Sequence, residues 1–177
     1  MLSMRRVVYV ASLAAVLFGS FFITLWLTEP EPATSPPIAA DNRSDTERLA
    51  AHRILNYSEL SKAAQNVGLR LSRQLKGNAD VISRINEREV SMAGWLVDPE
   101  GDSTPLNILV FIEGAMIAAA QTKGERPDVT RAIHLGFGSE KNVSFSVNFN
   151  CHPGDQPIVV GIGNGKQYIP LRSAKCP

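Results

Sequence analysis

Three acidic residues lie at alternate positions in the segment DPEGDSTP, which joins two strongly apolar runs of the chain. They are Asp98, Glu100 and Asp102, with Gly101 among them. Calcium-binding loops space their carboxylates in this way, and a hydrolase could use such acids for acid–base or metal-assisted chemistry. Calcium takes about six to eight oxygen ligands, however, and no bidentate acid follows at the distance that completes an EF-hand loop.

The same residue types also suit a connection between two strands. Pro99 fixes its own φ, Gly101 permits a positive φ, and Asp and Ser side chains hydrogen-bond nearby backbone amides. We therefore interpret the segment as a turn. A calcium site or a small envelope hydrolase built on Asp98, Glu100 and Asp102 is the alternative.

The histidines do not combine with other residues into a catalytic motif. His52, His134 and His152 fall in a predicted helix, a loop and a strand end, and the sequence has no HExxH, GxSxG, phosphate-binding glycine loop or zinc spacing. Cys151 is adjacent to His152, but neighbours on an extended chain point to opposite faces. The sequence therefore predicts no enzyme and no cofactor.

Cys151 and Cys176 are the two cysteines of the chain. In an exported segment, an even pair of cysteines indicates a disulfide. Cys151 ends a predicted strand and Cys176 lies one residue from the C-terminus. The disulfide would therefore tie the tail of the chain to the folded domain.

The N-terminal sequence predicts where the rest of the chain lies. Residues 7–27 are 21 residues without a charge, enough at about 1.5 Å per residue to cross a hydrocarbon core of about 30 Å as a transmembrane helix. Arg5 and Arg6 precede this segment, so the positive-inside bias places residues 1–6 in the cytoplasm and the C-terminal domain outside. We predict a single-pass protein of the bacterial inner membrane, with a cleaved signal peptide as the alternative.

Two segments separate the predicted span from the domain. Residues 28–43 are rich in proline and predict an extended spacer. Residues 44–77 favour one helix, because SDTE resembles a capping box and an apolar stripe follows at helical spacing. This stripe would pack against the following domain, which we favour, or against a second copy as a coiled coil. It consists of Leu60, Ala64, Val67, Leu71 and Leu75.

A homodimer is also suggested by the predicted span itself. Ala11, Ala15 and Gly19 form a ridge of small residues that would let two transmembrane helices approach closely.

From residue 86 to 177 the apolar pattern becomes that of β strands, with tight turns at Glu113-Gly114 and Asn164-Gly165. The strands are predicted at residues 87–97, 106–113, 116–121, 143–149, 158–162 and 167–171, with one helical turn within 124–138. The predicted fold class is mainly β: an immunoglobulin-like antiparallel sandwich preceded by a transmembrane helix and a juxtamembrane helix. Trp95 and Phe111 could stack on sugars, but Trp95 lies on an alternating strand and is assigned to the core between the sheets.

Four short segments resemble a β-sandwich module appended to exported bacterial envelope and cell-wall proteins. They are GWLVDPEG, NILVFIEG, ERPDV and the GF that precedes SFSVNFN, within about residues 91–171. Glu113-Gly114 stands where the module has Asp-Gly, and the cysteine pair is a further departure. The resemblance implies a non-catalytic accessory role and carries over no catalytic residue. Arg126 and Asp128, in the most specific segment RPDV, are predicted to brace their own loop.

Charge composition narrows the classes of partner. The chain has 18 Lys and Arg against 17 Asp and Glu, and the two signs are interspersed, which argues against nucleic-acid binding. We predict a non-catalytic, membrane-anchored envelope protein whose sandwich binds or scaffolds a protein partner or a polysaccharide.

Overall fold

The computed structural model describes residues 44–101, 104–133, 142–164 and 166–177. The predicted cytoplasmic tail, transmembrane span and spacer lie outside the described residues. Within the described part, no helix is long and apolar enough to cross a membrane. Arg43–Pro177 forms one unit by its internal contacts.

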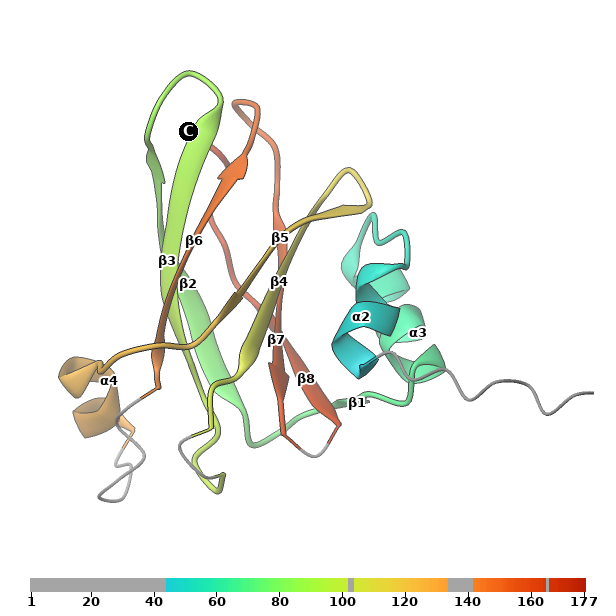
Figure 1. Ribbon diagram of the computed structural model, residues 1–177, viewed down its shortest axis with the longest axis vertical. Helices are drawn as coiled ribbons and strands as arrows, with labels where there is room; N and C mark the ends of the chain where they lie inside the picture. The colour runs from blue at the N-terminus through green and yellow to red at the C-terminus, as the bar shows by residue number, and fades with distance from the viewer. Residues whose placement is uncertain (1–43, 102–103, 134–141, 165) are drawn as a thin grey trace, which may run out of the picture. The chain divides into compact units, whose positions relative to one another are not determined.

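Eight strands in the described residues form two sheets (Figure 1). One sheet has the order β1-β8-β7-β4-β5, and the other has the order β2-β3-β6. Neighbouring strands are antiparallel except β1 and β8. The bounds are β1 Arg70–Leu71, β2 Lys76–Arg84, β3 Glu89–Val97, β4 Asn107–Ile112, β5 Ala115–Gln121, β6 Ser144–Asn150, β7 Ile158–Gly163 and β8 Gln167–Leu171. The mainly β, two-sheet fold predicted from the sequence is confirmed.

The two sheets pack face to face over an apolar core. In β3 and β6 every second side chain points into this core, which is why their sequences alternate. β6 shows the pattern most clearly, since its apolar residues are buried and its Ser and Asn residues are exposed or half-buried. The core includes Val90, Met92, Leu96, Ile108, Val110, Phe145, Val147, Phe149, Val159 and Leu171.

A second core lies on the other side of the five-stranded sheet. Figure 1 shows α2 (Asp45–Ala50) and α3 (Tyr57–Asn66) on the face of this sheet that points away from β2, β3 and β6. The helices cover alternate residues of β4 and β7, so these two strands are buried on both faces and their sequences are continuously apolar. This second core includes Leu49, Leu60, Ala64, Leu109, Phe111, Val160 and Tyr168.

The prediction of one helix over residues 44–77 is wrong. The capping box is present, with the Ser44 Oγ accepting from the Glu47 backbone N–H at 3.2 Å, but α2 ends at Ala50. Asn56 caps α3, whose end is set by Gly68 at φ +83°. The Gly68 and Leu69 amides return to the last turn of α3, in the Schellman arrangement that favours glycine.

The segment after α3 contains strands that the sequence did not predict. β1 follows Gly68 almost at once, and β2 begins at Lys76, so the β domain starts before residue 86. β2 buries only Ala79, and its sequence therefore lacks the alternation that would have revealed it.

The apolar stripe predicted for that helix divides between three environments. Leu60, Ala64 and Val67 are buried against the chain's own sheet, which confirms packing on the following domain for this part. Leu75 enters the core between the sheets, whereas Leu71 on β1 is 62% exposed.

Trp95 does not lie between the sheets, contrary to the prediction. Leu96 is the residue that faces the sandwich core, and its neighbour Trp95 therefore lies on the outer face of β3. There Trp95 is half-buried against a third apolar cluster formed with α4 (Pro127–Ala132). The cluster consists of Val97, Val129 and Val143, with Trp95 and Ile133 packed against it.

The predicted disulfide between Cys151 and Cys176 is confirmed. Their Cα atoms are 6.3 Å apart, and both residues are buried in the core between the sheets. The backbone of Cys176 also exchanges hydrogen bonds with Gly154 and Asp155. The C-terminal tail is therefore held covalently and by hydrogen bonds.

Candidate functional site

The acidic segment between β3 and β4 begins with a turn formed by residues 98–101. The Gly101 amide donates to the Asp98 carbonyl oxygen at 3.2 Å, and Asp98 Oδ1 accepts from the Glu100 amide at 3.3 Å. Asp, Pro and Gly at these positions are typical of a type I turn. Gly101 could adopt a positive φ, but its φ in the structure is not positive. Its role is spatial, because a Cβ there would lie 2.9 Å from the Asp98 carboxylate.

The acids of this segment have separate contacts. The Glu100 carboxylate accepts from Gln74 Nε2 at 2.5 Å, whereas the Asp98 carboxylate accepts within its own turn. Asp102 lies outside the described residues. Among the residues that are described, no three His, Cys, Asp or Glu side chains are grouped so as to hold a metal ion.

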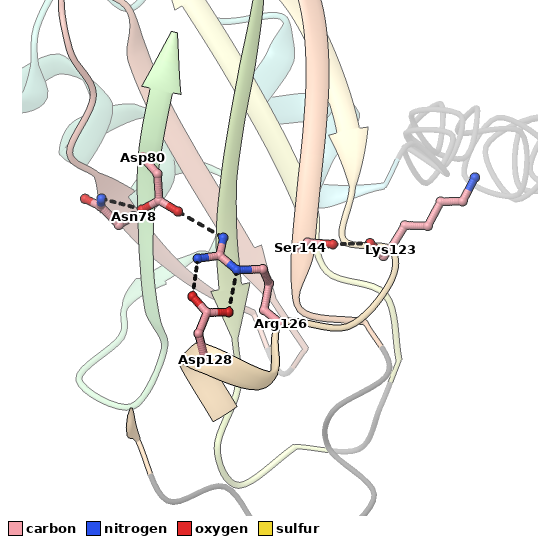
Figure 2. Close-up of polar contacts among 6 residues, drawn as sticks. All are labelled: Asn78, Asp80, Lys123, Arg126, Asp128 and Ser144. Carbon is pink, nitrogen blue, oxygen red and sulfur yellow. Dashed lines mark hydrogen bonds and ion pairs between the residues drawn. The ribbon is translucent and has the colours of Figure 1, made fainter. Parts of the chain in front are cut away.

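Arg126 and Asp128 form the centre of a charged network beside α4 (Figure 2). Arg126 Nε and Nη2 donate to the two carboxylate oxygens of Asp128 at 2.9 and 2.7 Å. Arg126 Nη1 donates to Asp80 Oδ2 at 3.0 Å, and Asp80 Oδ1 accepts from Asn78 Nδ2 at 2.8 Å. Arg126 therefore braces its own loop, as predicted, and also ties that loop to β2.

The ion pairs shift the pKa values of both partners. Hydrogen bonds from Arg126 lower the pKa of Asp128 to about 2 from its ordinary value of 3.8. The hydrogen bonds to Asp128, and then to Asp80, raise the pKa of Arg126 above its ordinary value. The cluster therefore has a structural role, since the guanidinium of Arg126 donates to carboxylates of the same chain.

We expect Asp128→Asn to destabilise the domain slightly at neutral pH and to have less effect in acid. A carboxylate with a lowered folded-state pKa stabilises the fold above its unfolded-state pKa, here near 3.8, and this contribution is lost as the pH falls toward about 2. Asp128 is 65% exposed, so solvent screening keeps the effect small. The measurement is urea unfolding of both proteins from pH 7 to pH 2.

The control is Glu125→Gln, which changes an exposed acid of the same loop. A difference between wild type and Asp128→Asn that stays constant between pH 5 and pH 2 would contradict the role assigned to the ion pair.

The histidines are placed on separate parts of the domain. His52 follows α2 and is half-buried, whereas His152 follows β6 and lies with its Nδ1 3.6 Å from Asp155 Oδ2. His134 lies outside the described residues. Cys151 is bonded to Cys176 and has no free thiol to form a pair with His152.

Two surface depressions that the sequence did not predict lie at opposite edge strands of the five-stranded sheet. The first, of about 420 Å³, lies where the chain after α2 meets the β4–β5 turn. The second, of about 380 Å³, lies beside β1 and is lined by Arg70, Leu71, Ser72, Arg73, Gln74 and Gln167. β1 is an edge strand, so one side of the second depression is open to a partner.

The depression beside β1 combines charge with an exposed apolar side chain. Within the described residues, the guanidinium groups of Arg70 and Arg73 make no hydrogen bond or ion pair, and both residues are exposed. Leu71 between them is the most exposed large hydrophobic residue of the described chain, at 62%. Arginine binds carboxylates in a bidentate manner, so this site suits an acidic ligand with an apolar group.

The sequence did not reveal the site beside β1, because residues 70–74 were assigned to a helix predicted over residues 44–77. The segment RLSR would have drawn attention as a cationic, partly apolar edge if the turn at Gly68 had been recognised.

The fold and site together define a disulfide-closed β-sandwich with a helical layer and a basic edge. Comparison of the chain with protein-family models, with curated proteins and with solved structures found no match.

Proposed function

We propose that this chain is a non-catalytic, membrane-anchored protein of the bacterial envelope whose immunoglobulin-like domain binds an acidic segment of a protein partner. The observation that carries the proposal is the exposed Leu71 between Arg70 and Arg73, whose guanidinium groups are unpaired within the described residues. An apolar contact at the centre of the site favours a protein segment over a polysaccharide.

The strand order supports an immunoglobulin-like assignment. Sheet β2-β3-β6 corresponds to strands A, B and E, and β8-β7-β4-β5 corresponds to G, F, C and C′. The short β1 extends the second sheet by pairing in parallel with β8. This arrangement also agrees with the resemblance to the exported β-sandwich module.

The location outside the cytoplasm is supported by two independent features. Residues 7–27 are uncharged and follow Arg5 and Arg6, the pattern of a membrane anchor with its N-terminus inside. The Cys151–Cys176 disulfide closes the domain, and disulfides persist in oxidising compartments. The proline-rich residues 28–43 would hold the domain away from the membrane.

The residues of the proposed site would contribute unequally to binding. Complete burial of a leucine side chain contributes roughly 2 kcal/mol, whereas an exposed ion pair contributes up to about 1 kcal/mol. Leu71 would therefore supply much of the affinity, and the two arginines would select and orient the acidic segment.

We expect a fluorescent peptide containing glutamate and leucine to bind intact spheroplasts that display the full-length protein. Leu71→Ser should weaken binding by about thirtyfold. Arg70→Glu combined with Arg73→Glu should weaken it at least as much, because it replaces two attractions with two repulsions. The measurement is peptide retained on washed spheroplasts, compared with the same membranes after lysis.

The matched control is Arg88→Glu combined with Arg172→Glu, which makes the same charge change at exposed positions away from β1. Equal loss in this control would show a net-charge effect and refute the site. Binding only after lysis would refute the external location. Binding of polygalacturonate in place of the peptide would show that the partner is a polysaccharide.

A further inference from the structure

We propose that β5 pairs antiparallel with β5 of a second copy of this chain, so that two five-stranded sheets join edge to edge. This inference rests on described residues of the domain and does not depend on the partner proposed for β1. A free strand edge presents unpaired backbone amides and carbonyl groups, which another strand can bind by main-chain hydrogen bonds.

The four edge strands of the two sheets differ in how well their side chains prevent pairing with a further strand. β1 carries Arg70, and β2 carries Lys76, Asp80 and Arg84, while β6 presents Ser and Asn residues. β5 has the sequence AMIAAAQ and carries no charge and no proline. Charged side chains and prolines are the usual means by which edge strands avoid pairing, and β5 lacks both.

β5 also exposes apolar side chains along its length. Met116 and Ile117 are each 38% exposed, and Ala115 and Ala119 are exposed. In a monomer these side chains contact water. Pairing with a second strand would satisfy the free backbone groups and cover part of these side chains with cross-strand neighbours.

One register of self-pairing matches large residues with small ones. Ala118 is the middle residue of β5, and antiparallel pairing centred on it is symmetric about a twofold axis. Met116 of each copy then lies opposite Ala120 of the other, and Ile117 lies opposite Ala119. The cross-strand pairs therefore fit by volume without a clash between bulky side chains.

The same register brings opposite charges together at both ends. Glu113 lies in the β4–β5 turn just before β5, at φ 51°, and Lys123 follows β5 by two residues. Each end of the dimer would therefore bring Glu113 of one copy near Lys123 of the other. Both residues are exposed, and neither side chain makes a hydrogen bond or ion pair within the described residues. Figure 2 shows the Lys123 side chain extending away from Ser144, whose Oγ donates to the Lys123 carbonyl oxygen.

The depression of about 420 Å³ at the β4–β5 turn lies at the same end of β5 as Glu113. Its lining includes Ala115, Met116 and also Arg53, so the lysine of the second copy would meet one carboxylate beside one cation of the chain. The Lys123 backbone amide donates to the Ser144 carbonyl oxygen of β6, so strand pairing is confined to Ala115–Gln121 and Lys123 contributes its side chain.

Two features of the structure oppose this pairing. β5 lies close to β6 of the other sheet, which leaves less room at its free edge. The register of β4 and β5 shifts between Val110 and Phe111, which places a β-bulge in the pair. A bulge bends and twists an edge strand and commonly discourages the addition of another strand. Sedimentation of the protein over a range of concentrations decides which effect prevails.

The test uses the full-length chain in detergent and a carbodiimide, which joins a carboxylate to an amine without a spacer. We expect a product that links Glu113 to Lys123. Within one copy the seven residues of β5 separate Glu113 from Lys123 by roughly 23 Å, so the link can form only between two copies. Absence of this product in a protein that sediments as a dimer would place the interface elsewhere and overturn the proposal.

Charge exchange tests the register. Glu113→Lys or Lys123→Glu alone should weaken dimerisation by about tenfold in sedimentation, since each places like charges opposite each other twice. The two substitutions together should restore both the dimer and the crosslink. Failure of the double exchange to restore the dimer would overturn the register.

A charge within β5 tests the edge itself. Ile117→Lys should abolish the Glu113–Lys123 crosslink, whereas Val81→Lys, at an exposed apolar residue of the edge strand β2, should leave the crosslink intact. The melting temperatures of both variants establish that they fold. A crosslink that survives Ile117→Lys, or a wild-type protein that is monomeric at all concentrations, would refute pairing through β5.

Discussion

Replacing Phe111 by alanine is expected to lower the free energy of unfolding by about 3–5 kcal/mol, the range for truncating a buried aromatic side chain. Phe111 is 0% exposed and lies on the face of β4 that α2 and α3 cover. The substitution would leave a cavity between the sheet and the helices. The measurement is urea denaturation, followed by circular dichroism and by tryptophan fluorescence.

The control is Leu55→Ala, because Leu55 lies between α2 and α3 and is 48% exposed. We expect that variant to remain within about 0.5 kcal/mol of wild type. Amide exchange in α3 should accelerate in Phe111→Ala, since the helix would lose part of the surface that holds it. A loss below about 1 kcal/mol would contradict the packing of the helices on β4.

Removing the disulfide by the double substitution Cys151→Ala and Cys176→Ala is expected to cost about 3 kcal/mol. The bond closes a loop across a sequence separation of 25, and the constraint on the unfolded chain accounts for most of this value in the loop-closure model. Both residues are also buried, at 7% and 4% exposure, so the alanines lose apolar contacts as well. Urea denaturation of the oxidised wild type and of the variant measures the difference.

A reducing agent provides the matched control for the disulfide. It should destabilise the wild type by a similar amount and leave the double alanine variant unchanged. Equal stability of oxidised and reduced wild type would show that the hydrogen bonds of the tail suffice without the bond. Those bonds join Cys176 to Gly154 and Asp155.

The two proposals concern opposite edges of one sheet. β1 and β5 are the terminal strands of the order β1-β8-β7-β4-β5. Pairing of two copies through β5 would place a β1 edge at each end of a ten-stranded sheet. Such a dimer would present two acidic-segment sites, and a partner with two such segments would bind with higher avidity than a single site allows.

Much of the β domain is visible in the sequence where one face of a strand is buried. In β3 and β6 the apolar residues alternate with polar or small ones, because the sandwich core lies on one side only. The turn at Glu113-Gly114 is equally local, since both residues have positive φ, of 51° and 88°. The cysteine pair was also predicted, because two cysteines allow only one pairing and the predicted export favours a disulfide.

The candidate site was less accessible to prediction from sequence. The acidic loop attracted attention by its residue types, but the Asp98 carboxylate accepts from the loop's own backbone and the Glu100 carboxylate accepts from Gln74. The basic edge at Arg70 and Arg73 was assigned to a helix, because the apolar spacing continues past Gly68 to Leu71 and Leu75. Only the left-handed backbone at Gly68 separates the two environments.

Strands β3 to β8, the turn at Glu113-Gly114, the disulfide and the charge balance can be read from the amino-acid sequence, because each depends on residue type or on neighbours a few positions away. The other features depend on how distant segments pack. That α2 and α3 cover β4, that Trp95 lies outside the sandwich and that Arg126 contacts Asp80 all depend on segments far apart in the chain. Local periodicity in the sequence indicates that a side chain is buried. Which surface buries it, and which strand lies at the edge of a sheet, depend on how distant segments pack.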